Sequence, residues 1–256
     1  MDDQGLQKAI QAAGGVTELA RRIGISQPSI SNWSRVPAER VLAVEAATGT
    51  GRAILRPDLY EGNAGELDDV DSARAQEYAL LATLLTRAPS ATLLRRLAKL
   101  RGDATPLSLA HAALGQAAHD ANAEQVEREF FNLFIGIGRG ELVPYGSYYL
   151  TGFLNERPLA RLRDDLRALG IARADNQREP EDHAAILCEI MSGLAGGSFA
   201  AAADAQREIF ETHLAPWVGR FFADLERAEE AGFYRQVGTI GRLFIDIETE
   251  AFALPS

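Results

Sequence analysis

The segment REPEDHAAILCEIM, residues 178–191, places Glu179, Glu181 and Asp182 directly before His183. Carboxylates beside a histidine occur in catalytic sites, in metal sites, in peptide-binding sites and at ordinary helix starts. Adjacent residues on a helix point about 100° apart, so Asp182 and His183 do not form a ready acid–base pair. The four histidines and one cysteine of the chain form no HExxH or paired-cysteine motif. We therefore predict no catalytic residue, no metal site and no cofactor.

The same segment has the features of a helix start. Pro180 suits the first helical turn, where amide donors have no intrahelical partner. Glu181 and Asp182 are favoured there by the positive end of the helix dipole. Apolar residues then recur at three- and four-residue steps, which predicts a helix over residues 181–197. A helix cap is thus the simplest interpretation of the carboxylates.

A second unusual segment is EFFNLFIGIGRGELVPYGSYYLTGF, residues 129–153, which is rich in aromatic side chains. It begins as an amphipathic helix, breaks at the glycines of residues 136–140, and returns with tyrosines. The glycine run follows a helix and lacks the Lys-Ser/Thr of a phosphate-binding loop, so it predicts a helix stop. We expect Phe130, Phe134 and Phe153 in the core. Tyr145 and Tyr148, beside a loop, combine apolar surface with a polar tip, as a peptide-binding groove requires.

The elements that hold these segments divide into two modules. Residues 1–60 carry seven basic and six acidic residues, whereas the remainder carries 19 basic and 30 acidic residues. Residues 61–72, EGNAGELDDVDS, are acidic and glycine-containing, which predicts a linker. Almost everything from residue 73 to 256 has helical periodicity, so we predict an all-α fold with a bundle of about eight to ten helices. No apolar run reaches the length of a membrane span, and a single cysteine favours a reducing compartment, so we expect a cytoplasmic protein.

The first module contains a helix-turn-helix pattern in VTELARRIGISQPSISNWSR, residues 16–35. Gly24 stands at the turn, where a positive φ is needed, and Ser26 can cap the second helix. The side chains expected to contact base edges are Gln27, Ser31, Asn32 and Arg35, and those expected to contact phosphates are Arg21, Arg22 and Arg40.

Residues 5–60 as a whole resemble the Cro/YdaS-like repressor domains. The resemblance implies DNA binding, and such motifs commonly act as dimers on paired half-sites, which favours a homodimer. The near-neutral charge of the module leaves open a helical packing unit without a DNA target.

Three motifs of the second module together resemble the TorD/DmsD family of redox-enzyme maturation chaperones. They are Phe-Asn-Leu-Phe-x-Gly at residues 131–136, Val-Pro-Tyr-Gly-Ser-x-Tyr-Leu at 143–150, and Glu-Pro-x-Asp-His at 179–183. The resemblance implies an all-helical, non-enzymatic chaperone that binds an apo-molybdoenzyme, often through its twin-arginine signal peptide, until the molybdenum cofactor is inserted. The ligand-binding positions that it implies are Leu133, Phe134, Pro144, Tyr145, Asp182 and His183.

Simple electrostatics agrees with this implication. Glu179, Glu181 and Asp182 would form an acidic lip for the guanidinium groups of a signal peptide, and the aromatic segment, including Tyr148, would receive its apolar part. The alternative hypothesis is a transcription regulator whose helical module senses a ligand or dimerises.

Overall fold

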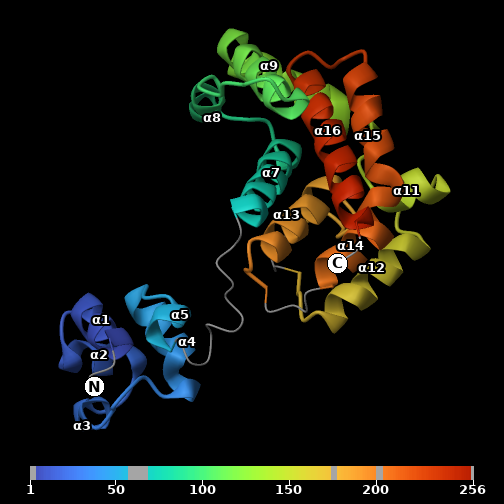
Figure 1. The fold of residues 1–256 in the computed structure, drawn as a ribbon. Coiled ribbons are helices and arrows are strands. Elements are labelled where there is room, and N and C mark those ends of the chain that lie inside the picture. Colours follow the sequence, from blue (N-terminus) through green and yellow to red (C-terminus); the bar gives the residue numbers. More distant parts are fainter. Residues whose placement is uncertain (1–3, 57–68, 174–177, 200–203, 255–256) are drawn as a thin grey trace. The chain divides into compact units, whose positions relative to one another are not determined.

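The computed structural model describes residues 4–56, 69–173, 178–199 and 204–254. These residues are helical apart from turns, loops and one isolated β-bridge, so the predicted all-α fold is confirmed for them. The chain divides into two compact units, Met1–Asp68 and Asp69–Ser256, which are described separately below (Figure 1). Among the described helices, none combines the length and the apolar character that a membrane crossing needs.

The first unit is a small helical domain around a helix-turn-helix. Its helices are α1 (Gln4–Ala13), α2 (Val16–Ile23), α3 (Gln27–Ser31), the 3-10 turn η1 (Ala38–Arg40), α4 (Val41–Thr48) and α5 (Arg52–Leu55). Leu19 and Ile30 are buried at the centre of its core, and Trp33 packs on them as a half-buried residue. As predicted, Gly24 follows α2 with φ 70°, and the Ser26 hydroxyl accepts a hydrogen bond from the Ser29 amide at the start of α3.

The second unit is a bundle in which long helices surround one large core. Its helices are α7 (Asp69–Thr86), α8 (Ala91–Leu97), α9 (Pro106–Asp120), α10 (Ala123–Phe130), the π-helical turn η2 (Phe131–Ile135), α11 (Gly146–Thr151), α12 (Arg157–Ala168), α13 (Ala184–Ala195), α14 (Ala205–Ile209), the π-helical turn η3 (Phe210–Leu214), α15 (Ala215–Arg227) and α16 (Phe233–Ala253). Helix α13 packs on α7, and α16 packs on both α15 and α9.

A buried ion pair joins α7 and α16, the first and last helices of this unit. Glu248 of α16 is only 1% exposed, and its carboxylate binds the Arg74 guanidinium of α7 at 2.7 Å. The hydroxyl of Tyr78 donates to the same carboxylate at 2.8 Å. Because a buried charge without partners is costly, this group fixes how α7 lies against α16.

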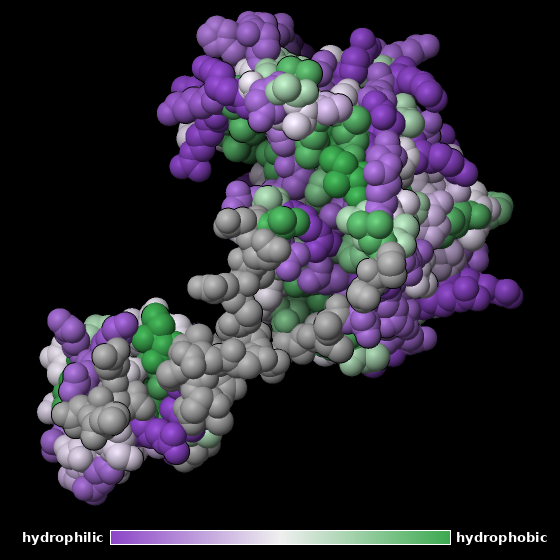
Figure 2. Space-filling model, viewed as in Figure 1, coloured by the Kyte–Doolittle hydropathy of each residue, from purple (hydrophilic) through white to green (hydrophobic). Residues whose placement is uncertain are grey.

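The surface follows the amphipathic pattern of the helices. Figure 2 shows a largely hydrophilic surface, with hydrophobic atoms gathered where α16 lies beside α7 and α9. The large apolar side chains are mostly in the core, and Trp217, Phe221 and Phe222 of α15 are fully buried there. Burial of such side chains is the main source of stability for a bundle of this kind.

Three sequence predictions need correction. Helix α7 begins at Asp69, so the last four residues of the expected linker 61–72 are helical, and the rest of that segment lies outside the described residues. Helix α13 begins at Ala184 with His183 as its N-cap, so Pro180, Glu181 and Asp182 precede the helix. Phe153 is 70% exposed, because the chain turns away from the core at Gly152, which ends α11 with φ 85°.

Candidate functional site

The two motif segments of the second unit meet at one isolated antiparallel bridge. Tyr145 pairs with His183: the Gly146 amide donates to the Asp182 carbonyl at 2.9 Å, and the Ala184 amide donates to the Pro144 carbonyl at 2.8 Å. These bonds hold the loop before α11 against the turn before α13. The bridge therefore brings together five of the predicted ligand-binding residues, Pro144, Tyr145, Glu179, Asp182 and His183.

The position of Gly146 shows how closely this loop approaches the core. A Cβ atom at Gly146 would lie 2.9 Å from the Nε1 atom of Trp217, closer than real Cβ contacts. The Trp217 indole in turn donates to the His213 carbonyl at 2.7 Å. Only glycine fits between the bridge and the indole, so the loop rests directly on α15.

Asp182 is the most constrained carboxylate of the site. Its side chain is 3% exposed, and Oδ2 accepts a hydrogen bond from the Ser147 amide at 2.8 Å. Oδ1 and the Ser147 hydroxyl are both buried and have no hydrogen-bond partner among the described residues. A buried polar atom is normally hydrogen-bonded, so these two atoms mark a place where a ligand or water is expected.

A small pocket lies beside Asp182. Its volume is about 100 Å³, and it is lined by Gly146, Leu150, Pro158, Arg161, Leu162, Asp182, Thr212 and His213. His213 is already engaged, because its Nε2 lies 2.7 Å from Oδ2 of Asp165. The volume corresponds to about three water molecules, so the pocket can hold the head of one side chain but no larger group.

His183 is the N-cap of α13, a role that the sequence pattern had assigned to the carboxylates before it. Its Nδ1 accepts a hydrogen bond from the Ala185 amide at 3.1 Å, and the side chain is 7% exposed. Burial lowers the pKa of His183 to about 4, against an opposing effect of Glu179 and Asp182. The imidazole is therefore neutral near pH 7, and its ring edge packs on Tyr145 with the ring centres 4.9 Å apart.

The other two carboxylates of the lip, residues 179–183, are also engaged. The Tyr145 hydroxyl donates to Oε2 of Glu179 at 2.5 Å, and burial together with this bond raises the pKa of Tyr145. Glu181 accepts from Nε of Arg163 on α12 at 2.8 Å. Of the three carboxylates, only Glu179 belongs to an exposed residue. The carboxylates of residues 179–183 are therefore mostly held by partners within the chain.

The remaining predicted residues lie apart from the bridge. Leu133 is fully buried in the core, so we infer that it supports the loop from within. Phe134 belongs to an aromatic cluster with Phe130 and Tyr234. Tyr148 of α11 packs instead beneath the Arg139 guanidinium, 5.5 Å from the ring centre.

Two residues of the site were missed by sequence reasoning. Ser147 stands inside the motif at residues 143–150, so its position in that motif was the available signal. Arg163 lies in an ordinary amphipathic helix, and its ion pair with Glu181 joins residues 18 positions apart across a turn. Such a contact leaves no local pattern in the sequence.

The predicted DNA-contact residues of the first unit are all exposed, but they do not share one helix face. Helix α3 ends at Ser31, so only Gln27 and Ser31 of the four residues expected at base edges lie on it; Asn32 caps the helix and Arg35 follows it. The Gln27 amide donates to the Ser31 hydroxyl at 3.0 Å within the helix. The predicted DNA-contact residues, each of which is exposed, are Gln27, Ser31, Asn32, Arg35, Arg21, Arg22 and Arg40.

The two arginines of α2 are held by an acidic neighbour. Glu18 accepts hydrogen bonds from Arg21 at 2.6 Å and from Arg22 at 3.1 Å. The bond from Arg21, followed by that from Arg22, lowers the pKa of Glu18 to about 2. Arg22 also donates to the Ala47 carbonyl at 3.1 Å. Phosphate contacts by these arginines would compete with Glu18.

Comparisons with known proteins give matches for both units. Residues 100–223 match the family described as nitrate reductase delta subunit, and residues 6–64 match the family described as bacterial toxin YdaS. The chaperone protein TorD of Vibrio cholerae is 30% identical over 139 residues, which cover 51% of this chain and 63% of that protein. TorD of Aliivibrio fischeri is 28% identical over 148 residues, which cover 54% of this chain and 68% of that protein.

A solved structure also aligns with the chain. It is a redox enzyme maturation protein from Archaeoglobus fulgidus, 18% identical, with a TM-score of 0.43, and the match covers 68% of this chain and 93% of that one. The family and TorD matches confirm that the second unit resembles TorD-type chaperones and that the first resembles YdaS-type domains.

Proposed function

We propose that this chain is a cytoplasmic maturation chaperone whose second unit binds an apo-molybdoenzyme client or its twin-arginine signal peptide. The observation that carries the proposal is Asp182: a buried carboxylate with one oxygen lacking a partner among the described residues, at the wall of a small pocket. The likeness to TorD proteins supports the client class, and the geometry supports the place of contact.

A guanidinium group is the natural occupant of this pocket. It is planar and carries five donors, so one of them can satisfy Oδ1 of Asp182, a residue that lines the pocket. A charge-assisted hydrogen bond of this kind is worth about 1.5–3 kcal/mol. The half-buried Tyr145 and exposed Leu150 and Phe153 offer apolar surface close by along the chain for the residues that follow an arginine.

His183 acts in this proposal as a positioning residue. It is neutral and buried, and its ring nitrogen is used by the helix cap. It therefore fixes the turn that presents Asp182, and we do not expect it to carry charge toward a client. Pro144 has the same indirect role, because its carbonyl accepts the Ala184 amide.

The proposal includes no bond-making chemistry. In the part of the chain that the structure describes, no three His, Cys, Asp or Glu side chains gather in a way that could hold a metal ion. Cys188 is fully buried, and burial raises the pKa of its thiol to about 12, so it is a poor nucleophile. Binding and release of a polypeptide require neither.

We also propose that the first unit binds DNA, with Gln27 and Ser31 at base edges and Arg21 at phosphate. The exposure of these residues around a helix-turn-helix supports it. A homodimer on paired half-sites would supply the second set of contacts that one near-neutral unit lacks. With both proposals, client binding by the second unit could be coupled to DNA binding by the first.

The test is calorimetric titration of the full chain with a peptide that carries a twin-arginine motif followed by an apolar stretch. We expect binding, and we expect Asp182→Asn to weaken it at least tenfold, because the Ser147 amide keeps its acceptor while the charge is lost. Asp164→Asn, an exposed carboxylate on α12, is the matched control and should bind as wild type.

A peptide with both arginines replaced by glutamine should also fail to bind. Equal binding of the arginine and glutamine peptides, or no effect of Asp182→Asn, would remove the proposed site. Absence of binding to both the peptide and a full apo-client would favour the regulator hypothesis instead.

A further inference from the structure

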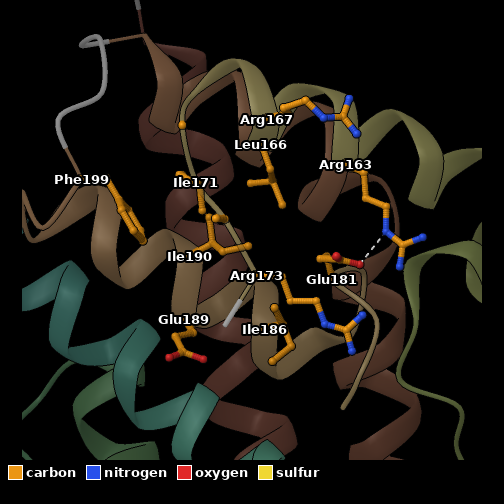
Figure 3. Close-up of a pocket in the computed structure, with 12 residues that line it drawn as sticks. Arg163, Leu166, Arg167, Ile171, Arg173, Glu181, Ile186, Glu189, Ile190 and Phe199 are labelled. Carbon is orange, nitrogen blue, oxygen red and sulfur yellow. Dashed lines mark hydrogen bonds and ion pairs between the residues drawn. The ribbon is translucent and has the colours of Figure 1, made fainter. Parts of the chain in front are cut away.

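A second, larger cavity lies between α12 and α13, apart from the small pocket at Asp182. Its volume is about 500 Å³, within the range of about 300–1,000 Å³ that is usual for small-molecule sites. Figure 3 shows apolar side chains from both helices and from the turns that follow them converging on its middle. These side chains are Leu166, Ile171, Ile186, Ile190 and Phe199.

The apolar wall is held by the core. Leu166, Ile186 and Ile190 are each less than one-tenth exposed. The Phe199 ring lies on Gly193, where an added Cβ would come within 2.3 Å of it. The cavity is therefore bounded by packed side chains of α12, α13 and the segments that follow them.

Arginines gather at one end of the cavity. Figure 3 shows the guanidinium groups of Arg163 and Arg173 on the same side as Glu181, with Glu189 at the other end. Arg163 binds Glu181 through Nε, and among the described residues its terminal nitrogens form no hydrogen bond or ion pair. Arg173 donates to the Arg178 carbonyl at 3.0 Å. This basic end stands out in a unit where acidic residues exceed basic ones.

We propose that this cavity binds a small apolar organic anion, with its chain on the apolar wall and its anionic group beside Arg163 and Arg173. A guanidinium presents several donors in one plane, and a carboxylate accepts them in pairs. A cationic ligand would meet two arginines, and an uncharged ligand would gain nothing from them. Such a site goes beyond the chaperone proposal, because it makes the second unit responsive to a metabolite.

The cavity is also linked to the lip through Glu181. An anion that binds Arg163 competes with Glu181 for the same guanidinium. Glu181 would then be released toward the neighbouring lip at residues 179–183, where an additional free carboxylate favours a cationic peptide. Occupancy of the cavity would thus raise the affinity of the lip for its client.

The experiment uses the full chain and three probes of equal chain length: octanoate, octanol and octylammonium, titrated by calorimetry. We expect octanoate to bind at least tenfold more tightly than octylammonium. Arg163→Gln and Arg173→Gln should each weaken octanoate binding about tenfold, the loss of one charge-assisted hydrogen bond. Arg157→Gln, an exposed arginine of α12 that does not line the cavity, is the matched control and should leave octanoate binding unchanged.

Two results would overturn the proposal. One is equal binding of octanoate and octylammonium, which would show that the site does not select an anion. The other is octanoate binding that neither arginine substitution weakens, which would place the ligand elsewhere. Hydrogen exchange gives a second measurement: octanoate should slow exchange in residues 163–173 and 184–195, and a slowing confined to other segments would also contradict the proposal. These outcomes are independent of the twin-arginine peptide test.

Discussion

The neutral, buried cap at His183 predicts a specific loss of stability in mild acid. Burial lowers the pKa of His183 from an ordinary 6.5 to about 4. Between these two values the unfolded chain binds a proton that the folded chain does not, so the free energy of unfolding falls as the pH falls. The contribution is complete above pH 6.5 and is lost progressively toward pH 4. At about 1.4 kcal/mol for each pKa unit, a change from pH 7 to pH 5 costs about 2 kcal/mol.

The perturbation that isolates this contribution is His183→Asn. Asparagine is a good N-cap and does not titrate, so the helix start is kept while the proton-binding group is removed. The assay is urea unfolding at pH 7 and pH 5, followed by the fluorescence of Trp217 in a Trp33→Phe background. The stability advantage of the histidine protein over the asparagine variant should shrink by about 2 kcal/mol between the two pH values. His119→Asn, an exposed histidine of α9, is the matched control and should leave the pH dependence as it is.

The reasoning is refuted if the two proteins differ by the same amount at both pH values, within about 0.5 kcal/mol. That outcome would mean that His183 gains or loses its proton as easily in the folded chain as in the unfolded one. Its role as a positioning residue for Asp182 would then need another explanation.

Three further predictions concern packing and charge. Glu248→Gln should lower the free energy of unfolding by about 3 kcal/mol because Arg74 loses its buried carboxylate and keeps only the partly exposed Asp71, whereas the exposed Glu250→Gln should change it by less than about 0.5 kcal/mol. Gly241→Ala should lower the free energy of unfolding, measured in urea, by about 1–3 kcal/mol because its Cβ would lie 2.3 Å from the Phe222 ring. Gly219→Ala, at a helical position with no atom within 4 Å of the added Cβ, should raise the same free energy by about 0.5–1 kcal/mol. Glu18→Gln should release Arg21, whereas Arg22 keeps its bond to the Ala47 carbonyl, so the salt slope of duplex DNA binding, measured by fluorescence anisotropy, should steepen by about one; an unchanged slope would show that Arg21 does not contact phosphate.

The sequence predicted those features that depend on near neighbours. The turn at Gly24 and the cap at Ser26 are set by residues within one helical turn, and both are confirmed. The helical character of the second unit follows from apolar periodicity, which is also local. For the same reason the glycine run was correctly predicted to end a helix, since Gly136 follows η2 with φ 59°.

The features that sequence reasoning got wrong depend on distant partners. Asp182 was expected at an exposed lip, but its carboxylate is buried and accepts a hydrogen bond from the Ser147 amide, 35 residues upstream. Glu181 was expected to be available to a client, but Arg163 neutralises it. The predicted first turn at Pro180 shifted to Ala184, because the backbone of the preceding residues pairs with the loop at Tyr145 and cannot also be helical.

The bridge between Tyr145 and His183 has a consequence for how such a protein can diversify. Residues 146–182, which include α12, form one long segment of the chain. The two hydrogen bonds of the bridge hold the two ends of this segment together. Lengthening or altering a loop whose ends are fixed costs little free energy and does not move the ends. Arg163 and Arg173, at the arginine end of the larger cavity, belong to this segment. The bridge, with its bonds at Gly146, Asp182 and Ala184, joins the ends of the segment. Natural variants can therefore replace Arg163 and Arg173, and with them the ligand preference of the cavity, while the backbone bridge that holds Asp182 stays the same.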